Sequence, residues 1–522
     1  MNDSPARLEP RLILLLCLVF LTGSSWLRAD FRIEPYLQNP TPQAITMVWF
    51  SENNQPGQLI LQGDGVSFQK SLVSSPLRAD ALAYHPEELV DDDSPYHHEI
   101  RIDGLEPGKQ YQYRVRQGEE EAEGRFSTPS LVQAPLRFVV FGDSETEPES
   151  AGKATPWPGA GGLERHYLVD QETGYRENLK IIEGREPHFV AIAGDLVQSG
   201  GEQRDWDAFW RLTGPLASQT YLFPALGNHE YFAGPGVLGG YGAADSGRAV
   251  EKYQTYFDLP AAGSGTEGKH EHYYRVDWGP VTLIALDLNN GLPNRAPGDT
   301  NFYMLGAGEG GFAPDWQPGS AQYRWLEQTL EQAQRDSAFT FVVFHHCPYS
   351  SGVHGQSPGR GEGQDPLSGK PLQKLTPLFM RYGVDALFTG HDEMYEHSIV
   401  PGKEQMLNGG VSEHQLHVYD VGIGGDGLRG PIPGLVNPHR VFLAHDDAPE
   451  IYDERGVLLD GGKHYGHLEV NVNPAREGGW QARLDMVYVF PVTNSEGKVL
   501  GFERRLYDDS ITLFSNRRMD EE

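Results

Sequence analysis

The sequence predicts two domains, an all-β sandwich at residues 30–130 followed by a larger layered α/β domain at residues 136–522. Two observations predict this order. In the first region, short runs of alternating apolar and polar residues are separated by turn residues, as in half-buried strands. In the second, short apolar strands alternate with segments of helical periodicity, as a layered α/β domain requires. A chain of 522 residues is long enough for both domains.

Residues 1–29 are predicted to be a secretory signal peptide. Arg7 and Arg11 precede an apolar run from Leu12 to Leu21, which small and polar residues follow. Because this run is short for a bilayer, we expect a periplasmic or secreted protein with no stable membrane insertion after cleavage. Of the 2 cysteines, only Cys347 lies outside the signal, so the mature chain can form no internal disulfide.

The alternation that predicts the sandwich is clearest in residues 45–50 and 111–115. Turn residues such as Asn39-Pro40 and Glu106-Pro107-Gly108 separate the runs. Short strands at this spacing are typical of a β-sandwich. The region shows no catalytic cluster, and its histidines are interpreted as surface or packing residues: His85, His97 and His98.

In the second domain, five apolar strands each lead into a side chain that can bind a metal ion. These side chains, four of them directly after a glycine, are Asp143, Asp195, Asn228, His345 and His391. Open α/β sheets place ligands at the carboxyl ends of their strands, so we expect the five to lie together. A further strand at 281–286 ends at Asp287, which is interpreted as structural.

Helical periodicity predicts the connections between these strands. The segments concerned are 167–183, 205–212, 249–257 and 322–335. The Gly/Pro-rich stretch 147–162 is a candidate lid, whereas the loops 291–319 and 352–369 receive no assignment. Alternating runs from about residue 465 predict antiparallel strands that belong to the same α/β domain.

Carboxylate, amide and imidazole ligands in this mixture suit divalent metals such as Mn, Fe and Zn. Two such ions can clamp a phosphate between them and lower the pKa of a bridging water. His229 follows Asn228 and could reach the phosphate or its leaving group, with Glu230 orienting it from behind.

The order Gly-Asp, Gly-Asp, Gly-Asn-His-Glu, Val-x-x-His and Gly-His resembles that of the calcineurin-like metallophosphoesterases. The segments 35–40 and 104–108 are similar to the leading β-domain of purple acid phosphatases. The resemblance implies a fibronectin type III-like sandwich and an αββα-type second domain. It also implies an exported, acid phosphatase-like hydrolase that cleaves a small phosphomonoester with a metal-bound hydroxide.

The resemblance further implies a dinuclear centre in which Asp195 bridges the ions. Asn228, His345 and His391 would bind the second ion, and Asp143 the first. His346 also fits the Val-x-x-His pattern, but relatives with such a pair followed by proline use the first histidine. The residues expected to contact substrate are Asn228, His229 and His354, and the two histidines are the candidate catalytic acids.

Three positions depart from the family pattern. Gln198 stands where purple acid phosphatases have the tyrosine that colours a ferric ion, so that chromophore is not implied. Glu145 and Glu393 stand where relatives have histidines. We therefore expect an oxygen-rich first site that favours Mn, Mg or Ca over Zn. The prediction is two divalent ions drawn from Mn, Fe, Zn, Mg or Ca.

Alternative functions stay open at this stage. One is a phosphodiesterase or nucleotide hydrolase of the same family, and another is a phosphate- or metal-binding protein whose first site has decayed. A scaffold role for the β-domain has no positive feature beyond its fold. The formal net charge of −31 argues against nucleic-acid partners, because like charges repel. The sequence makes no prediction of the oligomeric state.

Overall fold

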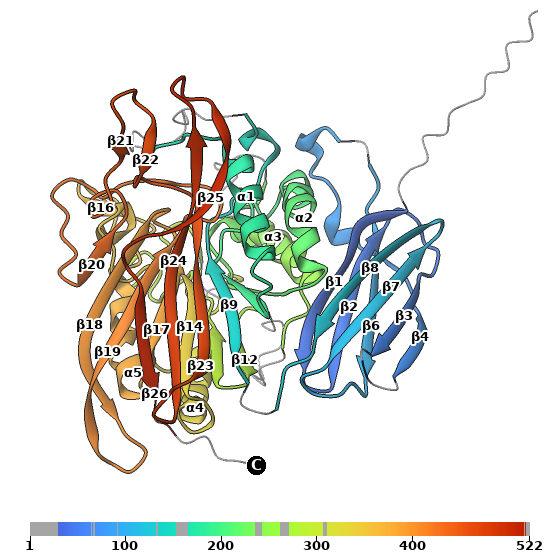
Figure 1. Ribbon diagram of the computed structural model, residues 1–522, viewed down its shortest axis with the longest axis horizontal. Coiled ribbons are helices and arrows are strands. Elements are labelled where there is room, and N and C mark those ends of the chain that lie inside the picture. Colours follow the sequence, from blue (N-terminus) through green and yellow to red (C-terminus); the bar gives the residue numbers. More distant parts are fainter. Residues whose placement is uncertain are drawn as a thin grey trace, which may run out of the picture.

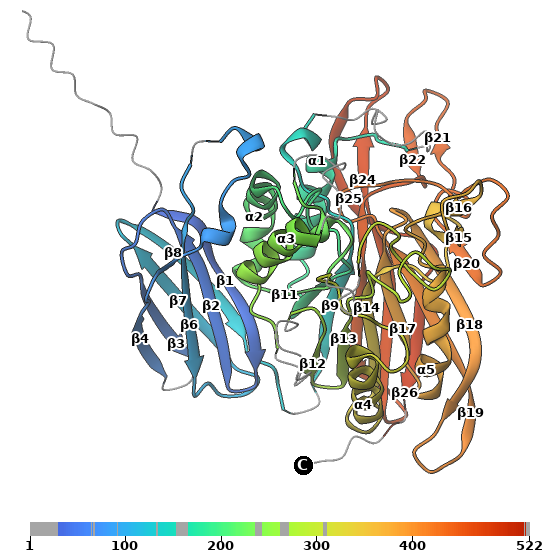
Figure 2. The same ribbon diagram turned by 180° about the vertical axis from the view of Figure 1, so that it is seen from behind.

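The computed structural model describes residues 30–515 and 517, apart from residues 64, 66–67, 91, 132–133, 153–164, 235–242, 261–270 and 306–310; for residues 243–245 it describes the backbone only. The predicted signal peptide and most of the candidate lid at 147–162 lie outside the described residues. Figures 1 and 2 show a β-rich N-terminal part beside a larger mixed α/β part.

The N-terminal part consists of two four-stranded antiparallel sheets. One has the order β1-β2-β6-β5 and the other β4-β3-β7-β8. The strands are β1 (Phe31–Thr41), β2 (Ala44–Ser51), β3 (Gln58–Gly63), β4 (Gln69–Val73), β5 (Leu77–Arg78), β6 (Tyr96–Asp103), β7 (Gln110–Gln117) and β8 (Glu120–Ser127), with short 3-10 turns η1 (Asp80–Leu82) and η2 (Pro86–Glu88). Strand β7 alternates strictly between exposed and buried residues, as its sequence predicted.

The two sheets pack against each other through large apolar side chains. Trp49 of β2 is fully buried, and its indole Nε1 donates a hydrogen bond to Gln117 of β7 at 3.1 Å. His98 is buried between Ser51 and Ser74, 2.7 Å from each hydroxyl. It is therefore a packing residue in a satisfied polar pocket. The closer likeness to a fibronectin type III domain stays a prediction.

The second part contains two seven-stranded sheets. The first has the order β11-β10-β9-β23-β24-β25, with β26 also pairing with β24, and the second β12-β13-β14-β17-β19-β18-β20. The first sheet consists of β9 (Leu136–Phe141), β10 (Phe189–Ile192), β11 (Tyr221–Pro224), β23 (Gly466–Pro474), β24 (Trp480–Thr493), β25 (Val499–Leu506) and β26 (Ile511–Ser515). The second consists of β12 (Tyr274–Trp278), β13 (Val281–Ala285), β14 (Phe339–His346), β17 (Ala386–Gly390), β18 (Tyr395–Gln405), β19 (Val411–Val421) and β20 (Arg440–Leu443).

Each sheet has a parallel centre that carries the predicted strand ends. Strands β9, β10 and β11 pair in parallel in the first sheet, and β13, β14 and β17 in the second. Their apolar residues are buried on both faces, as in layered α/β folds. The sheets face each other through aromatic contacts such as Phe138 with Phe341, whose ring centroids lie 5.6 Å apart. The C-terminal strand β23 pairs antiparallel with β9, so the tail completes the first sheet.

Helices cover the outer faces of this pair of sheets. They are α1 (Gln171–Glu183), α2 (Gln203–Ala217), α3 (Ala243–Tyr256), α4 (Ala321–Asp336) and α5 (Thr376–Arg381). The first three lie on the side of the N-terminal sandwich, whereas α4 and α5 lie against the second sheet (Figure 2). Helix α1 begins later than predicted because the Asp170 carboxylate caps it by accepting from the Thr173 amide at 2.9 Å. Helix α5 is too short to show helical periodicity in the sequence.

Short elements complete the second part. These are the two-stranded pairs β15 (Ser357–Pro358) with β16 (Gln364–Asp365) and β21 (Ile451–Tyr452) with β22 (Leu458–Asp460), and the 3-10 turns η3 (Pro148–Ser150), η4 (His229–Tyr231), η7 (Val353–Gly355) and η8 (Lys370–Leu375). Turns η4 and η7 carry candidate site histidines.

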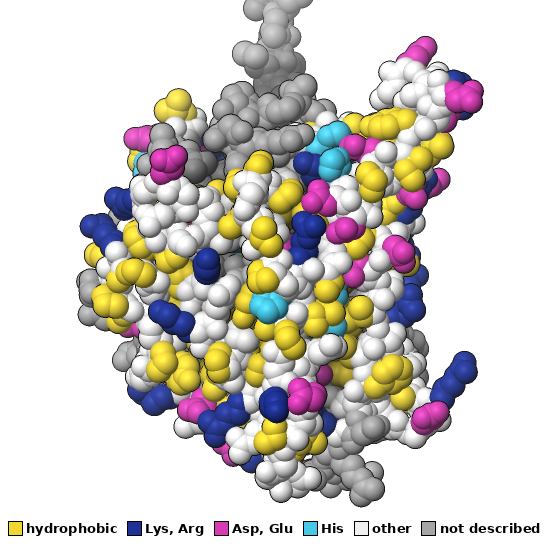
Figure 3. Space-filling view, turned by 90° about the vertical axis from the view of Figure 1, so that its left-hand side faces the viewer, with side chains coloured by type: hydrophobic (Ala, Val, Ile, Leu, Met, Phe, Trp, Pro, Cys, Tyr) yellow, Lys and Arg dark blue, Asp and Glu magenta, His cyan; other side chains and the backbone are white. Residues whose placement is uncertain are grey.

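Direct polar contacts join the sandwich to the helices of the second part. The buried Tyr36 hydroxyl donates to the carbonyl oxygen of Tyr256 at 2.7 Å, and the Asp258 carboxylate accepts from Thr46 at 2.6 Å. On the face shown in Figure 3, acidic and basic side chains are interspersed among apolar ones. Among the described residues, no helix is both long and apolar enough to cross a membrane.

Candidate metal centre

The predicted strand ends meet at one edge of the paired sheets. Three of their residues, Asp143, Asp195 and His391, have positive φ angles of 57°, 52° and 78°. Non-glycine residues rarely adopt this conformation, and such strain concentrates at functional sites. The turns support one another, because the Asp143 amide donates to the Gly194 carbonyl and the Glu145 amide to the Asp195 carbonyl, both at 3.0 Å.

Two glycines allow the turns to approach so closely. A Cβ atom on Gly390 would lie 2.0 Å from Asp143 Oδ2, and one on Gly227 would lie 2.1 Å from Asp195 Oδ1. Any larger residue at either position would displace a site carboxylate.

At the position predicted for the second ion, four side chains converge. His345 Nε2 lies 2.9 Å from Asp195 Oδ2, 2.9 Å from Asn228 Oδ1 and 3.1 Å from His391 Nδ1. All four side chains are buried. The structure thus brings together the residues that the sequence predicted for this position.

The outer nitrogens of the two imidazoles decide what this position can hold. His345 Nδ1 lies 2.8 Å from the Ala193 carbonyl oxygen, and His391 Nε2 lies 2.7 Å from the Leu367 carbonyl oxygen. Because a carbonyl oxygen only accepts, each outer nitrogen carries the proton. In the neutral rings that bind a metal ion, the inner nitrogens, 3.1 Å apart, then carry the lone pairs. These lone pairs face the shared position, so the side chains fit a bound divalent ion.

The electrostatics of the same four residues also favour a positive charge. Burial opposes protonation of His345, but the Asp195 carboxylate outweighs it and raises the pKa of this histidine to about 9. Burial likewise opposes ionisation of Asp195, yet His229 and His345 hold its pKa below the ordinary value. The Asp195 carboxylate is therefore ionised and requires a cation beside it.

His346, the other histidine of the pair, points elsewhere. Its ring packs against the His391 ring with centroids 4.1 Å apart, and both of its nitrogens are buried without a hydrogen-bond partner. Burial lowers the pKa of His346, so the ring is neutral. His345, not His346, is the histidine beside Asp195 and Asn228.

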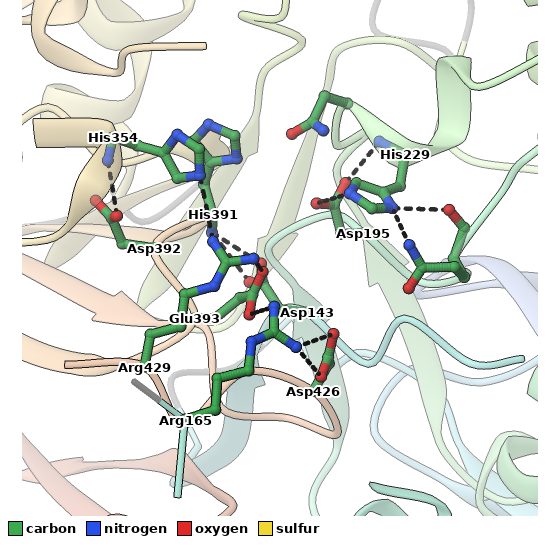
Figure 4. A network of polar contacts seen from close by, with 12 residues as sticks. Asp143, Arg165, Asp195, His229, His354, His391, Asp392, Glu393, Asp426 and Arg429 are labelled. Atoms are coloured by element: carbon green, nitrogen blue, oxygen red, sulfur yellow. Dashed lines mark hydrogen bonds and ion pairs between the residues drawn. The ribbon is translucent and has the colours of Figure 1, made fainter. Parts of the chain in front are cut away.

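At the position predicted for the first ion, one of the carboxylates, Glu393, meets protein cations. Asp143 accepts from the backbone amide of His391 at 2.9 Å. A carboxylate oxygen of Glu145 lies within 4.8 Å of Asp195 and His229 in one group of possible ligands, and of Glu393 and Asp426 in another. Glu393 Oε2 lies 2.7 Å from the guanidinium of Arg165, and its other oxygen pairs with Arg429. Figure 4 shows both arginines directed at Glu393.

This pairing changes the interpretation of Glu393. Both of its oxygens already contact positive charges, which repel a further cation placed beside them. Oxygen atoms of Glu145, Glu393 and Asp426 also lie within 4.8 Å of one another, a spacing that could hold a cation. Glu393 as a metal ligand stays a prediction, beside Asp143, Glu145 and the shared Asp195.

The two candidate acids lie on opposite sides of this centre (Figure 4). His229 Nδ1 donates to the Gln198 carbonyl oxygen at 2.7 Å, which leaves Nε2 directed at Asp195, 3.8 Å away. His354 stacks on His391 with ring centroids 3.6 Å apart, and its Nδ1 lies 2.8 Å from Asp365 Oδ2. Burial opposes protonation of His354, but the Asp365 carboxylate raises its pKa.

Glu230 has a different role from the one its sequence position suggested. Its carboxylate accepts hydrogen bonds from the backbone amides of Asp195, Leu196 and Gly227, at 3.0, 2.8 and 2.7 Å. The carbonyl of Gln198, not Glu230, orients His229. Glu230 thus holds together the two turns that present Asp195 and Asn228.

Sequence reasoning missed four residues of this site: Arg165, Asp365, Asp426 and Arg429. Arg165 follows the glycine-rich stretch, and Asp426 and Arg429 follow strand β19, which ends at Val421. No motif marks them, and the partner of Arg165, Glu393, lies 228 residues away in the chain.

Comparisons with known proteins agree with this arrangement. Residues 136–394 match the family model of the calcineurin-like phosphoesterases. An uncharacterized protein of Mycobacterium tuberculosis is 29% identical over 315 residues, which is 58% of this chain and 51% of that protein, so the chain spans about half the length of this relative. Purple acid phosphatase 23 of Arabidopsis thaliana is 26% identical over 388 residues, 71% of this chain and 70% of the relative. The structure of a purple acid phosphatase from yellow lupin seeds matches 92% of this chain and 73% of its own, with a TM-score of 0.59 and 20% identity, and so supports the fold.

Proposed function

We infer that this chain, which carries a calcineurin-like phosphoesterase domain within a purple acid phosphatase-like fold, is a metal-dependent phosphoric ester hydrolase acting on small phosphomonoesters. The observation that supports this most strongly is the pair of inner imidazole nitrogens of His345 and His391 beside Asp195 and Asn228. A divalent ion bound there would polarise a phosphoryl oxygen and lower the pKa of a water molecule.

The surrounding residues are arranged to bind and orient a phosphate ester. Asn228 has an amide group whose oxygen faces His345, and the nitrogen of such an amide can donate to a phosphoryl oxygen. The sharp turns at Asp143 and Asp195, both with positive φ angles, present the two carboxylates at the site before substrate arrives.

His229 and His354 would handle the proton that the leaving alkoxide needs. The hydrogen bond from His229 Nδ1 to the Gln198 carbonyl leaves Nε2 as the atom that takes up and releases a proton. Asp365 stabilises a protonated His354 ring, whereas the Arg429 guanidinium, 3.5 Å from Nε2, opposes a proton on that atom. Either histidine is within the same polar network as the metal position.

The donor set at the second position bears on the kind of ion. Two imidazole nitrogens with two oxygens fit Mn, Fe or Zn better than Mg or Ca, which prefer oxygen ligands alone. The expectation of a harder metal rested on Glu145 and Glu393, and the pairing of Glu393 with arginine speaks against it.

The predicted signal peptide supports export to the periplasm or the outside of the cell, which the N-terminal sequence of the mature protein would test. The paired Glu393 favours one alternative, a phosphate-binding protein with an altered first site. A phosphodiesterase or nucleotide hydrolase of the same family is the other alternative.

The decisive experiment compares p-nitrophenyl phosphate with bis(p-nitrophenyl) phosphate as substrates of the purified chain supplied with Mn²⁺ or Zn²⁺. We expect the monoester to be hydrolysed faster, and the Asn228→Ala variant to lose this turnover. Faster hydrolysis of the diester would favour the phosphodiesterase. Phosphate binding without turnover would favour the binding protein.

A further inference from the structure

Two arginines form a network of ion pairs on the first-ion side of the site. Arg165 and Arg429 lie opposite each other in an isolated antiparallel β-bridge, although 264 residues separate them in the chain. The Arg429 amide also donates to the Glu393 carbonyl oxygen at 2.9 Å. The backbone therefore positions both guanidinium groups relative to Glu393.

The side chains of this network are closely paired, although the Nε atoms of Arg165 and Arg429 are buried without a hydrogen-bond partner. Arg165 joins two carboxylates, with Nη2 at 2.7 Å from Glu393 and Nη1 at 3.2 Å from Asp426. Tyr167 reinforces the pairing, because its hydroxyl lies 2.9 Å from Arg165 and 3.2 Å from Asp426. The Arg165 side chain is only 7% exposed, and buried ions of this kind are stable only when paired.

The turn at residues 424–428 closes tightly on the same glutamate. Gly427 has a φ of 91°, and a Cβ atom there would lie 2.1 Å from Glu393 Cβ. The turn therefore packs directly against the Cβ atom of Glu393. The two ion pairs hold its carboxylate between the two guanidinium groups.

We propose that Arg165 and Arg429 take the place of the first metal ion, so that the chain binds one divalent ion and holds the substrate phosphate between that ion and Arg429. This proposal rests on the proposed function and specifies the charge that the site uses. It replaces the expected oxygen-rich site of Asp143, Glu145, Asp195 and Glu393.

Arg429 is positioned to contact the substrate phosphate. Its guanidinium Nη1 lies 3.5 Å from His354 Nε2, and His354 stacks on His391, one of the residues of the second position. Its side chain is 16% exposed, about twice the value for Arg165, so it faces the open side of the network. A planar guanidinium binds phosphate oxygens in a fork, which suits it to this position.

The first test is the metal content per chain after equilibration with Mn²⁺ and removal of free ion, measured by elemental analysis. We expect about one ion in the wild type, about one in Glu393→Gln, and about none in His345→Ala. Two ions in the wild type would overturn the arginine substitution, whether or not Glu393→Gln loses one of them. No bound ion together with no hydrolysis of p-nitrophenyl phosphate would instead overturn the proposed function.

The second test is binding of inorganic phosphate to the Mn²⁺-loaded protein by calorimetry. Arg429→Gln should weaken phosphate binding at least tenfold without changing the metal content. The matched control is Arg440→Gln, which removes an arginine paired with Asp446 on the exposed strand β20. Unchanged phosphate affinity in Arg429→Gln, with the metal still bound, would overturn the role of Arg429.

Discussion

The two sides of Asp195 differ in how the protein treats charge. On one side, Asn228, His345 and His391 converge on a common point beside Asp195. On the other side, Arg165 and Arg429 already neutralise Glu393. Both sides lie at the same edge of the paired sheets and derive from corresponding family motifs. The difference shows that a motif position fixes where a side chain lies, whereas its neighbours decide what it binds.

The largest expected effect is on the side of Asp195 that carries the second metal position. Replacing His345 with alanine removes an inner nitrogen of the second position, and hydrolysis of p-nitrophenyl phosphate should fall by about 1,000-fold or more, about 4 kcal/mol of transition-state stabilisation. Steady-state kinetics at saturating Mn²⁺ measure this loss. His445, an exposed histidine paired with Glu450, supplies the control variant His445→Ala, which should keep full activity. Equal activity in both variants would exclude His345 from the centre.

The next effect distinguishes the two candidate acids on either side of the centre. His229→Ala and His354→Ala should each lower kcat, and the variant that lacks the general acid should lose about 100- to 10,000-fold. A poor leaving group requires protonation more, so that variant should lose more activity on an alkyl phosphate than on p-nitrophenyl phosphate. Comparing kcat for the two substrates identifies the acid. Identical losses on both substrates would argue that neither histidine protonates the leaving group.

A smaller effect concerns the frame that both sides share. Glu230→Gln keeps the shape of the side chain but provides one acceptor oxygen for three buried backbone amides. We expect a loss of about 2–3 kcal/mol in the free energy of unfolding, because buried donors are left unsatisfied. Urea denaturation measures it, with the exposed Glu503→Gln as a control that should change little. A stability equal to that of the wild type would show that the two turns do not depend on Glu230.

The smallest effect tests a second buried glutamate that is paired with two arginines, at a position away from the site. Glu469 on β23 pairs with Arg185 and Arg504 at 2.8 and 3.0 Å. Burial opposes its ionisation, but the hydrogen bond from Arg185 and the other contacts lower its pKa from 4.5 to about 2. The ionised form therefore stabilises the fold above pH 4.5, and this contribution is lost as the pH falls toward 2.

The measurement for this pair is the unfolding free energy of Glu469→Gln and of the wild type at several pH values. The variant should be less stable by about 1–2 kcal/mol at pH 7, after allowance for solvent screening. The difference should shrink as the pH falls below 4.5. A difference that is independent of pH would mean that the arginines do not depend on the charge of Glu469.

The sequence by itself determined the order of the parts and one half of the site. Strand periodicity located the sheets, and the glycine before each polar strand end located Asp143, Asp195, Asn228 and His391. These signals are local, since a strand, a sharp turn and the residue after it lie within a few positions of one another. The assignment of residues 465–515 to the same domain also followed from strand alternation, although the sequence could not show that β23 pairs with β9.

Only the tertiary structure decided which of His345 and His346 faces Asp195, and what Glu393 contacts. The two histidines are adjacent, so the choice depends on which face of β14 meets the first sheet. Arg165 and Arg429 reach Glu393 from segments with no motif of their own, the first of them from 228 residues away. Electrostatic pairing depends on distance in space and not along the chain, and for this reason the charge balance of the first position could not be derived from the motifs.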